Sequence, residues 1–294
     1  MNRRQIFRLN LPSRTLVLGE RTLVMGVLNV TPDSFSNGGK FLDTNRAIEH
    51  ALVMGAAGAD LLDMGGESTR PGSCGTPAEE ELAHVLPVLH GLRGRLKIPI
   101  SIDTQKLEVA EAALDAGAEI INDISGLKSD PHLAELAARH RVPLVLMHMR
   151  GEPRTMQKGE FARDVLKDVT EGLRKSVSIA RKAGVAKSQI ILDPGIGFGK
   201  SFAQNYELLE KLPQLAKLGY PLLVGTSRKG FLGAALARDG KPAPPQERIW
   251  GTAATVTASI LNGAHIVRVH DVAEMVQVAR AADFLVHPAL RRSI

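Results

Sequence analysis

The feature that most constrains the fold of this chain is a repeat of short apolar runs, each followed by a helix-like segment. The runs are too short for helices and are rich in strand-forming residues. The eight expected strands are Thr22–Asn29, Asp60–Asp63, Ile98–Asp103, Ile120–Asp123, Pro143–His148, Gln189–Asp193, Pro221–Thr226 and His265–His270. The expected helices are approximately Asn45–Ala57, Ala78–Arg93, Leu107–Ala116, Pro131–Arg139, Asp164–Ala183, Tyr206–Leu218, Glu247–Asn262 and Val272–Ala281.

Strand–helix alternation indicates a parallel sheet, and eight units in 294 residues match an α/β fold, the single (β/α)8 TIM barrel. A doubly wound sheet is the alternative, but it gathers ligands at one crevice instead of around a ring. No composition break divides the chain, so we expect one domain over residues 1–294 with a core of about 22–283. Leu16–Leu18 and Leu23–Met25 flank Gly19-Glu20, which predicts a short amino-terminal β-hairpin leading into the first strand.

Composition narrows the class of protein. The net charge of +6 suits an anionic ligand or nucleic acid, but aromatic residues make up only 4% and the basic residues are scattered, which argues against base-stacking platforms. The single cysteine, Cys74, excludes an internal disulfide and fits a reducing compartment. The amino terminus lacks a signal-peptide pattern, and no apolar run approaches the ~20 residues of a membrane span, so we expect a cytoplasmic protein.

Every expected strand ends in Asn, Asp, Thr or His, and the carboxyl ends of barrel strands form the rim that carries active sites. Asp103, Asn122 and Asp193 stand at three of these ends. A carboxylate accepts two hydrogen bonds side by side, which suits an amino-substituted heterocycle with adjacent N–H donors. The alternative is that all three merely cap the helices that follow.

Polar loops follow several strands. Pro32 ends the first strand near Asn29, and the loop after it carries hydroxyls and one phenyl ring, Phe35. The loop after the second strand holds Thr69 and Arg70, whose hydroxyl and guanidinium suit phosphate oxygens. Arg268 and His270, at the end of the eighth strand, are two further candidate anion contacts, where barrels often hold phosphate.

Lys229 follows the seventh strand, and three roles are open for it. It could be a Schiff-base nucleophile, a fixed donor to a ring carbonyl or nitrogen, or a solvated lysine at a helix start. No cluster of His and Cys predicts a zinc or iron site. A Mg²⁺ ion held mostly by ligand phosphates needs only one or two protein oxygens, of which Asn29 could supply one.

Taken together, these stretches closely resemble the dihydropteroate synthase family of folate synthesis. The resemblance runs in order through Met25–Gly39, Gly65–Gly72, Ser101–Thr104, Ile120–Asp123, Asp193–Lys200, Ser227–Lys229 and Arg268–Asp271. It implies a transferase that condenses 6-hydroxymethyl-7,8-dihydropterin diphosphate with 4-aminobenzoate, yielding 7,8-dihydropteroate and pyrophosphate. It also implies a homodimer formed through outer helices. Where Gly230 stands, many relatives carry a hydroxyl residue, which leaves the details of aminobenzoate binding there open.

By this resemblance the candidate site residues divide into three groups. The pterin ring is expected on Asp103, Asn122, Asp193 and Lys229. The diphosphate and Mg²⁺ are expected on Asn29, Thr69, Arg70, Arg268 and His270. The aminobenzoate pocket is expected at Phe35, Pro71, Phe198 and Ser227. Sulfonamides mimic aminobenzoate and would bind in the same pocket.

Three rival interpretations remain open at this point. A methyltetrahydrofolate–corrinoid methyltransferase would share the acidic floor but needs no diphosphate loop. An aldolase would use Lys229 as its nucleophile. A non-catalytic nucleic-acid binder would account for the positive charge.

Overall fold

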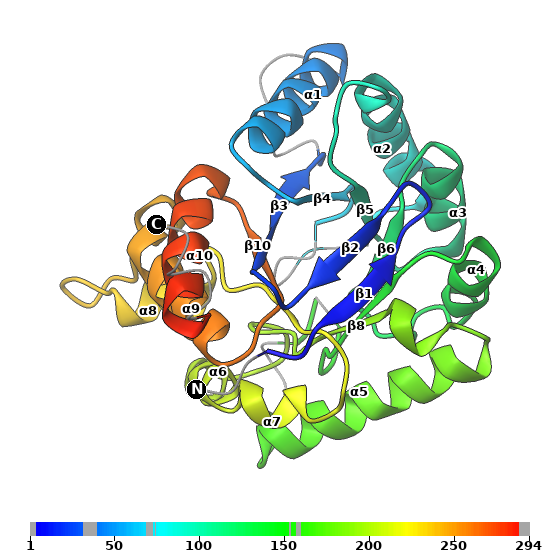
Figure 1. The fold of residues 1–294 in the computed structure, drawn as a ribbon. Coiled ribbons are helices and arrows are strands. Elements are labelled where there is room, and N and C mark those ends of the chain that lie inside the picture. Colours follow the sequence, from blue (N-terminus) through cyan, green and yellow to red (C-terminus); the bar gives the residue numbers. More distant parts are fainter. Residues whose placement is uncertain are drawn as a thin grey trace.

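The chain is an eight-stranded parallel sheet closed into a barrel and surrounded by helices (Figure 1). The computed structural model describes residues 4–31, 40–68, 73, 75–152, 154–156 and 160–287, the side chains of 40–42 excepted. The strands, in sheet order, are β8 (Ile190–Asp193), β7 (Leu144–Met147), β6 (Ile120–Asp123), β5 (Ile100–Asp103), β4 (Leu61–Gly65), β3 (Leu23–Asn29), β10 (Ile266–Val269) and β9 (Leu223–Val224). A parallel bridge between Leu192 and Leu222 joins the two end strands, so the predicted (β/α)8 barrel is confirmed.

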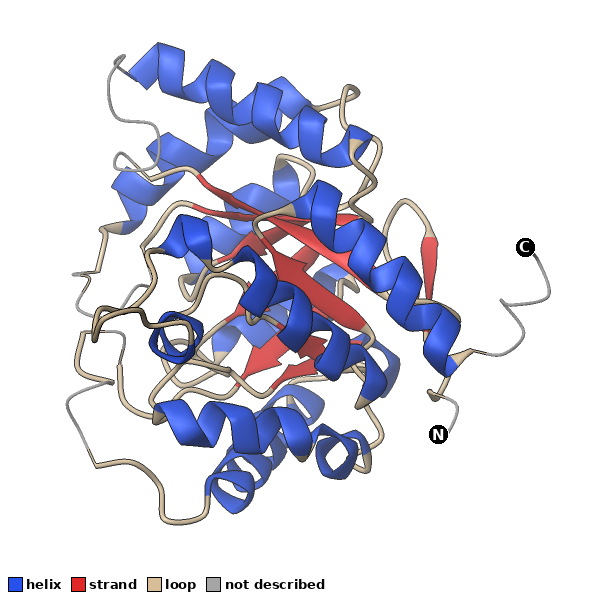
Figure 2. Ribbon diagram, turned by 90° about the vertical axis from the view of Figure 1, so that its left-hand side faces the viewer, coloured by secondary structure: helices blue, strands red, loops and turns tan. Residues whose placement is uncertain are grey.

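Helices lie outside the strands on all sides (Figure 2). They are α1 (Lys40–Ala56), α2 (Ala78–Leu92), α3 (Leu107–Asp115), α4 (His132–His140), α5 (Val165–Lys182), α6 (Phe202–Glu210), α7 (Leu212–Ala216), α8 (Gly230–Ala235), α9 (Ile249–Leu261) and α10 (Val272–Val286). The helix expected over Tyr206–Leu218 is two helices, α6 and α7. Pro213 explains the break, because it has no N–H to continue α6 but is tolerated in the first turn of α7.

The amino-terminal hairpin exists, but its predicted partners were wrong. β1 (Phe7–Asn10) pairs antiparallel with β2 (Thr15–Leu18), whereas Leu23–Met25 belongs to the parallel barrel strand β3. The reason is packing: Leu9 and Leu18, on the two hairpin strands, are buried in one apolar cluster with Met25. The segment around Gly19-Glu20 is therefore the link from the hairpin to the barrel.

The interior of the barrel changes character along its axis. At the amino-terminal end, Leu61, Ile120, Val145 and Ile191 pack against the hairpin leucines as one cluster. Side chains alternate along each strand, so the residues two positions further on also face the interior. Those next positions include Asp63, Asn122, Met147 and Asp193. The hairpin thus seals one end of the barrel, and the polar residues lie toward the other.

Candidate active site

A network of charged side chains crosses the barrel interior at the carboxyl ends of its strands. Arg268 on β10 donates from Nε to Asp63 Oδ2 at 2.6 Å and from Nη2 to Asp103 Oδ2 at 2.8 Å. Asn122 Nδ2 donates to the same Asp63 oxygen at 3.0 Å. Four strands, β4, β5, β6 and β10, are therefore joined by side-chain hydrogen bonds at this level of the barrel.

Asp63 was expected to end its strand, and this was wrong. β4 continues to Gly65, so Asp63 is an interior strand residue and is fully buried. Gly65 lies opposite Asp103 in the register, and a Cβ added to Gly65 would lie 3.4 Å from Asp103 Cβ. The missing side chain leaves room beside Asp103 at the rim.

Burial and charge shift the titration of these carboxyls. Burial and, after it, the neighbouring Asp63 raise the pKa of Asp103, Arg268 opposes both, and the resulting pKa is about 7. Burial also raises the pKa of Asp193, against the attraction of Lys229. Burial lowers the pKa of Arg268, but Asp63 and Asp103 outweigh it and the pKa ends above its ordinary value.

Asp103, Asn122 and Asp193 do not cap the helices that follow their strands. The capping positions of α3, α4 and α6 belong to Lys106, Pro131 and Ser201. Asp193 instead accepts the N–H of Gly195 at 2.7 Å, which leaves its second oxygen available. Capping therefore does not account for Asp103, Asn122 or Asp193.

Lys229 is half-buried and bonded within the protein, so it is not a solvated lysine. It stands at the amino-terminal cap of α8, and its Nζ donates to the carbonyl of Ile196. The same Nζ lies 4.6 Å from the centre of the Phe198 ring, a cation–π contact. Burial lowers its pKa to about 8, while Asp193 favours the charged form.

Ser227 and His270 form a second polar pair on the rim. The backbone N–H of His270 donates to Ser227 Oγ at 3.1 Å, and His270 Nδ1 lies 3.0 Å from the same oxygen. When the Ser227 hydroxyl donates to Nδ1, the ring proton sits on Nε2 and can be given to an anion. Burial and Arg268 lower the pKa of His270 to about 4, so the ring is neutral at pH 7.

The backbone between Ser227 and Lys229 is held in an unusual conformation. Arg228 has φ of +58°, in the left-handed region. Its N–H donates to Thr252 Oγ1 at 3.1 Å, and its guanidinium pairs with Asp271 through Nε at 3.0 Å. These contacts hold the turn in which Ser227 and Lys229 are presented on either side of Arg228.

Several predicted residues lie outside the described part of the chain. These are Phe35, Thr69, Arg70 and Pro71. Asn29 is described as the last residue of β3, half-buried, beside Gly65 in the register. The structure thus brings together Asp103, Asn122 and Arg268 as one network, with Lys229 and Phe198 in mutual contact beside it.

Two residues of this region were missed by the sequence interpretation. Asp63 is one; its signal was a lone acidic residue inside an apolar run, two positions before a glycine. Lys200 is the other; it is 1% exposed and bonded to His148. Burial lowers its pKa to about 7, against the attraction of Asp193.

The described residues contain no cluster of three or more His, Cys, Asp or Glu side chains suited to a metal. Asn29 fits a different kind of site, because a neutral amide oxygen at the rim can complete a Mg²⁺ shell made mostly of phosphate and water oxygens. The described residues are therefore compatible with a Mg²⁺ ion that is held mainly by the phosphate oxygens of a ligand.

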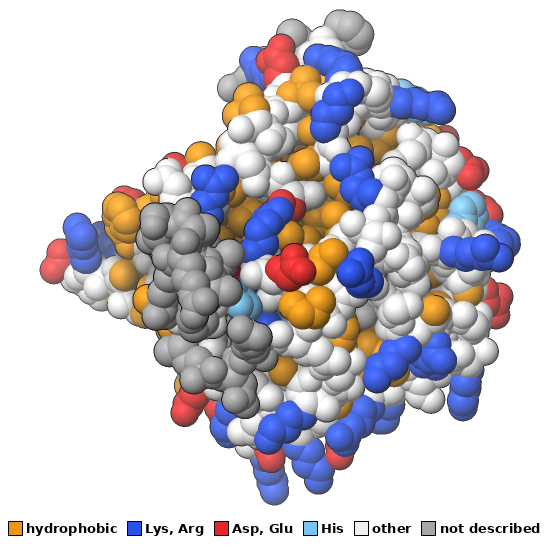
Figure 3. Space-filling view, viewed as in Figure 1, with side chains coloured by type: hydrophobic (Ala, Val, Ile, Leu, Met, Phe, Trp, Pro, Cys, Tyr) orange, Lys and Arg blue, Asp and Glu red, His pale blue; other side chains and the backbone are white. Residues whose placement is uncertain are grey.

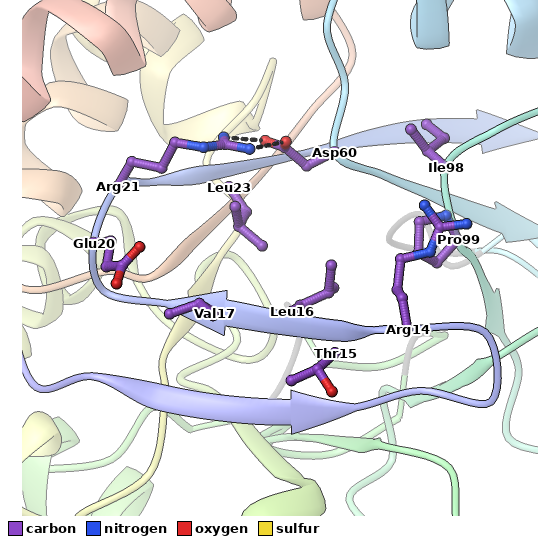
Figure 4. Close-up of a pocket in the computed structure, with 10 residues that line it drawn as sticks. All are labelled: Arg14, Thr15, Leu16, Val17, Glu20, Arg21, Leu23, Asp60, Ile98 and Pro99. Carbon is purple, nitrogen blue, oxygen red and sulfur yellow. Dashed lines mark hydrogen bonds and ion pairs between the residues drawn. The ribbon is translucent and has the colours of Figure 1, made fainter.

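A separate cavity of about 470 Å³ lies between the hairpin and the amino-terminal end of the barrel (Figure 4). Its wall includes Leu16, Leu23 and Pro99, and Arg21 pairs with Asp60 along one side of it, Nη1 lying 2.8 Å from Oδ2. On the same face, hydrophobic side chains show between scattered Lys and Arg (Figure 3). Leu23 begins the strand that Asn29 ends, so this cavity and the charged network lie at opposite ends of the barrel.

Comparison with known proteins identifies the class and then the family. A sequence model described as "Pterin binding enzyme" matches residues 25–270, which places the chain among the pterin-binding enzymes. A dihydropteroate synthase of Synechocystis sp. is 49% identical over 91% of each chain. The Xanthomonas albilineans dihydropteroate synthase, solved with 4-aminobenzoic acid, superposes with a TM-score of 0.88 at 42% identity, covering 96% of this chain and 98% of that one. Solved with 7,8-dihydropteroate, it superposes with a TM-score of 0.84 at 40% identity, covering 95% and 98%.

The chain belongs to the dihydropteroate synthase family, whose members are transferases of folate synthesis. This membership decides against the methyltransferase, aldolase and nucleic-acid-binding interpretations. Among the described helices, none combines the length and the apolar character that a membrane crossing requires.

Proposed function

We propose that this chain joins 6-hydroxymethyl-7,8-dihydropterin diphosphate to 4-aminobenzoate, with release of pyrophosphate and formation of 7,8-dihydropteroate. One observation carries the proposal beyond family membership: Arg268 is held between Asp63 and Asp103, with Asn122 bonded to Asp63. This is a rigid floor of alternating donors and acceptors, and the edge of an aminopterin presents the complementary pattern.

The floor also fits the charge that the reaction develops. An electron-rich dihydropterin shares positive charge at its exocyclic methylene as the bond to the diphosphate oxygen breaks. We assign the ring to Asp103, Asn122, Asp193 and Lys229. The carboxylates of Asp103 and Asp193 then stabilise the cation-like transition state in a buried setting, where fixed charges act strongly.

The leaving group is assigned to the rim. His270 can donate from Nε2 and Arg268 from its guanidinium, and Asn29, Thr69 and Arg70 complete the set. When Mg²⁺ is bound with the diphosphate, it neutralises charge on the departing oxygens. Arg268 links the two halves of the site, because it bonds to the carboxylate of Asp103, which is assigned to the ring, and stands at the same strand end as His270.

The nucleophile needs positioning more than activation. An arylamine nitrogen is weakly basic and attacks without a strong general base, so orientation and exclusion of water supply the acceleration. We assign aminobenzoate to Phe198 and Ser227, with Phe35 and Pro71. Phe198 supports this through its ring contact with Lys229, which joins the aminobenzoate side of the pocket to the pterin side.

The deciding experiment measures pyrophosphate release from the pterin diphosphate with Mg²⁺, with and without 4-aminobenzoate. We expect release that depends on aminobenzoate and a 7,8-dihydropteroate product. Asp193→Asn is expected to weaken pterin binding severely in calorimetry while the fold survives. Tight pterin binding by the unaltered chain without release under any condition would contradict the proposed reaction.

We further infer that the chain acts as a cytoplasmic, single-domain homodimer, joined through the surface around α8. Four side chains bordering α8 are apolar and exposed: Trp250 (79%), Phe202 (52%), Tyr206 (40%) and Leu236 (37%). The Tyr206 ring packs edge-on against Phe231 of α8 at 5.0 Å, and α6, α8 and α9 lie together on one side of the barrel (Figure 1). A patch of this kind is typical of a protein interface.

The dimer is tested by light scattering with size-exclusion chromatography. Trp250→Glu is expected to shift the mass from about 63 kDa to the 31.6 kDa of one chain, because a buried unpaired charge opposes association. Val53→Glu is the matched control, since Val53 is also exposed (62%) but lies on α1. A monomeric unaltered chain would contradict the proposal, as would equal shifts in both variants.

A further inference from the structure

The loop between β8 and α6 contains a buried lysine that the proposed chemistry does not use. Lys200 is 1% exposed, although lysine is almost never fully buried unless it is paired. Its Nζ lies 2.9 Å from the carbonyl oxygen of Phe198, 3.1 Å from that of His148 and 3.2 Å from His148 Nδ1. An ammonium has three N–H donors, so each donor has one acceptor.

His148 is held from its other side by α5. Because Nδ1 faces an ammonium, it accepts, and the ring proton sits on Nε2, 3.6 Å from Asp168 Oδ2. Asp168 in turn pairs with Arg150 at 3.1 Å. A Cβ added to Gly172 would lie 2.4 Å from His148 Cδ2, so the ring rests directly on the α5 backbone. His148 is therefore a fixed support for Lys200.

The loop itself lies flat on the segment that follows β7. Gly195 has φ of +66°, and a Cβ there would lie 1.9 Å from the His148 carbonyl oxygen. Gly199 has φ of +64°, and its Cβ would lie 2.1 Å from the Arg150 carbonyl oxygen. The loop and the segment after β7 are thus in direct backbone contact. The ammonium of Lys200 lies between the carbonyls of His148 and Phe198 and donates to both, so neither buried acceptor is left unpaired.

The opposite surface of this loop faces the candidate site. Ile196 accepts the hydrogen bond of Lys229, and the Phe198 ring lies over the same ammonium. Gly197 N–H donates to Asn205 Oδ1 at 2.6 Å, which ties the first half of the loop to α6. The second half of the loop is held at Phe198, whose carbonyl accepts a hydrogen bond from Lys200 Nζ.

We propose that Lys200 is a positioning residue for the aminobenzoate half of the site, acting through Phe198. It holds the Phe198 backbone against His148 and so fixes the ring that forms one wall of that pocket. This inference rests on the proposed function. Only the ammonium form of lysine supplies three donors from one atom, so glutamine or methionine at this position cannot satisfy both carbonyls and the ring nitrogen. Lys200 itself does not touch substrate.

The test compares Lys200→Met with Lys217→Met, an exposed lysine that follows α7. For Lys200→Met we expect the KM for 4-aminobenzoate to rise about tenfold, because a displaced Phe198 ring no longer orients that substrate in its pocket. The calorimetric Kd of the bare pterin should change less than about threefold, since the interior floor is untouched. Lys217→Met should change neither. Equal losses for both ligands would overturn the proposal, because they indicate a general structural role.

A double-mutant cycle with Phe198→Ala tests the route of action. If Lys200 acts through Phe198, the double variant should show the aminobenzoate KM of Phe198→Ala alone. Additive effects would overturn the proposal. If Lys200→Met does not fold, Lys200→Gln, which keeps two donors and no charge, is judged by the same criteria.

A readout independent of catalysis separates this inference from the proposed function. In Lys200→Gln, amide hydrogen exchange of residues 195–200 is expected to accelerate, while that of the β5 and β6 amides stays unchanged. Unchanged exchange of the loop would overturn the positioning role. The unaltered chain could make no dihydropteroate while the loop amides of the variant still exchange their hydrogens faster. That result would contradict the proposed reaction but would support the role of Lys200 in holding the loop.

Discussion

At the scale of single residues, the site depends on the balance between the buried carboxylates of Asp63 and Asp103 and the guanidinium of Arg268. Asp63 lies close enough to Asp103 to raise the pKa of the Asp103 carboxyl, and Arg268 opposes that rise while it bonds to both carboxylates. Asp63 Oδ1 and Ser101 Oγ, both buried, have no hydrogen-bond partner among the described atoms. The two buried residues therefore differ in role: Asp63 orients Arg268 and Asn122 through hydrogen bonds, while the Ser101 hydroxyl orients no described neighbour.

We expect Asp63→Asn to lower the free energy of unfolding by about 3 kcal/mol, because Arg268 loses a buried charge partner. Ser101→Ala, in the paired position on β5, should change it by less than about 1 kcal/mol, since no hydrogen bond is lost. Urea denaturation of both variants checks this. Similar losses in the two would show that the position, and not the carboxylate, matters.

At the scale of elements, the loop from Gly195 to Lys200 is defined by close backbone approach. Gly195 and Gly199 are required for two reasons: their φ angles are left-handed, and the backbone opposite leaves no space for a Cβ. Since the loop also provides the acceptor for Lys229, its packing on the end of β7 determines where that ammonium lies.

Gly195→Ala separates these two requirements when it is compared with Gly94→Ala. Gly94 also has positive φ, +74°, but nothing lies within 4 Å of a Cβ added there. Gly94→Ala should cost about 1–2 kcal/mol from the left-handed conformation alone. Gly195→Ala should cost at least about 2 kcal/mol more, because the His148 carbonyl must move. Equal costs in denaturant titrations would refute the packing explanation.

At the scale of the whole molecule, the amino-terminal segment completes the barrel. Arg4 donates to Thr22 Oγ1 and to the Ala264 carbonyl, both at 2.7 Å, and pairs with Asp283 of α10. His265 accepts the N–H of Leu222 at Nδ1, 3.1 Å away, and its Nε2 lies 3.1 Å from the Gln5 carbonyl. The neutral ring thus joins the amino-terminal segment to the barrel strands.

This arrangement predicts acid sensitivity. Burial lowers the pKa of His265 to about 4, below the value of about 6.5 in the unfolded chain. Between these values the unfolded state binds a proton that the folded state does not, so stability falls as pH decreases from about 6.5 to about 4. His270, with its pKa of about 4, acts in the same direction.

Thermal unfolding across this pH range checks the prediction. His265→Gln should flatten the dependence of stability on pH, because one of the groups that protonate only on unfolding is gone. His90→Gln, at an exposed position near the end of α2, is the matched control. If His265→Gln keeps the full slope, the neutral His265 is not a source of the acid sensitivity.

By itself the sequence determined the alternation of strands and helices, the closed barrel and the rim on which Asp103, Asn122, Asp193 and Lys229 stand. These follow from local periodicity and from chain breakers such as Pro32, which act within a few residues. Only the tertiary structure decided that β2 pairs with β1, that Asp63 holds Arg268 across 205 positions, and that Lys200 bonds to His148 across 52. Those contacts depend on strand register and on the packing of distant loops, and neither leaves a periodic signal in the chain.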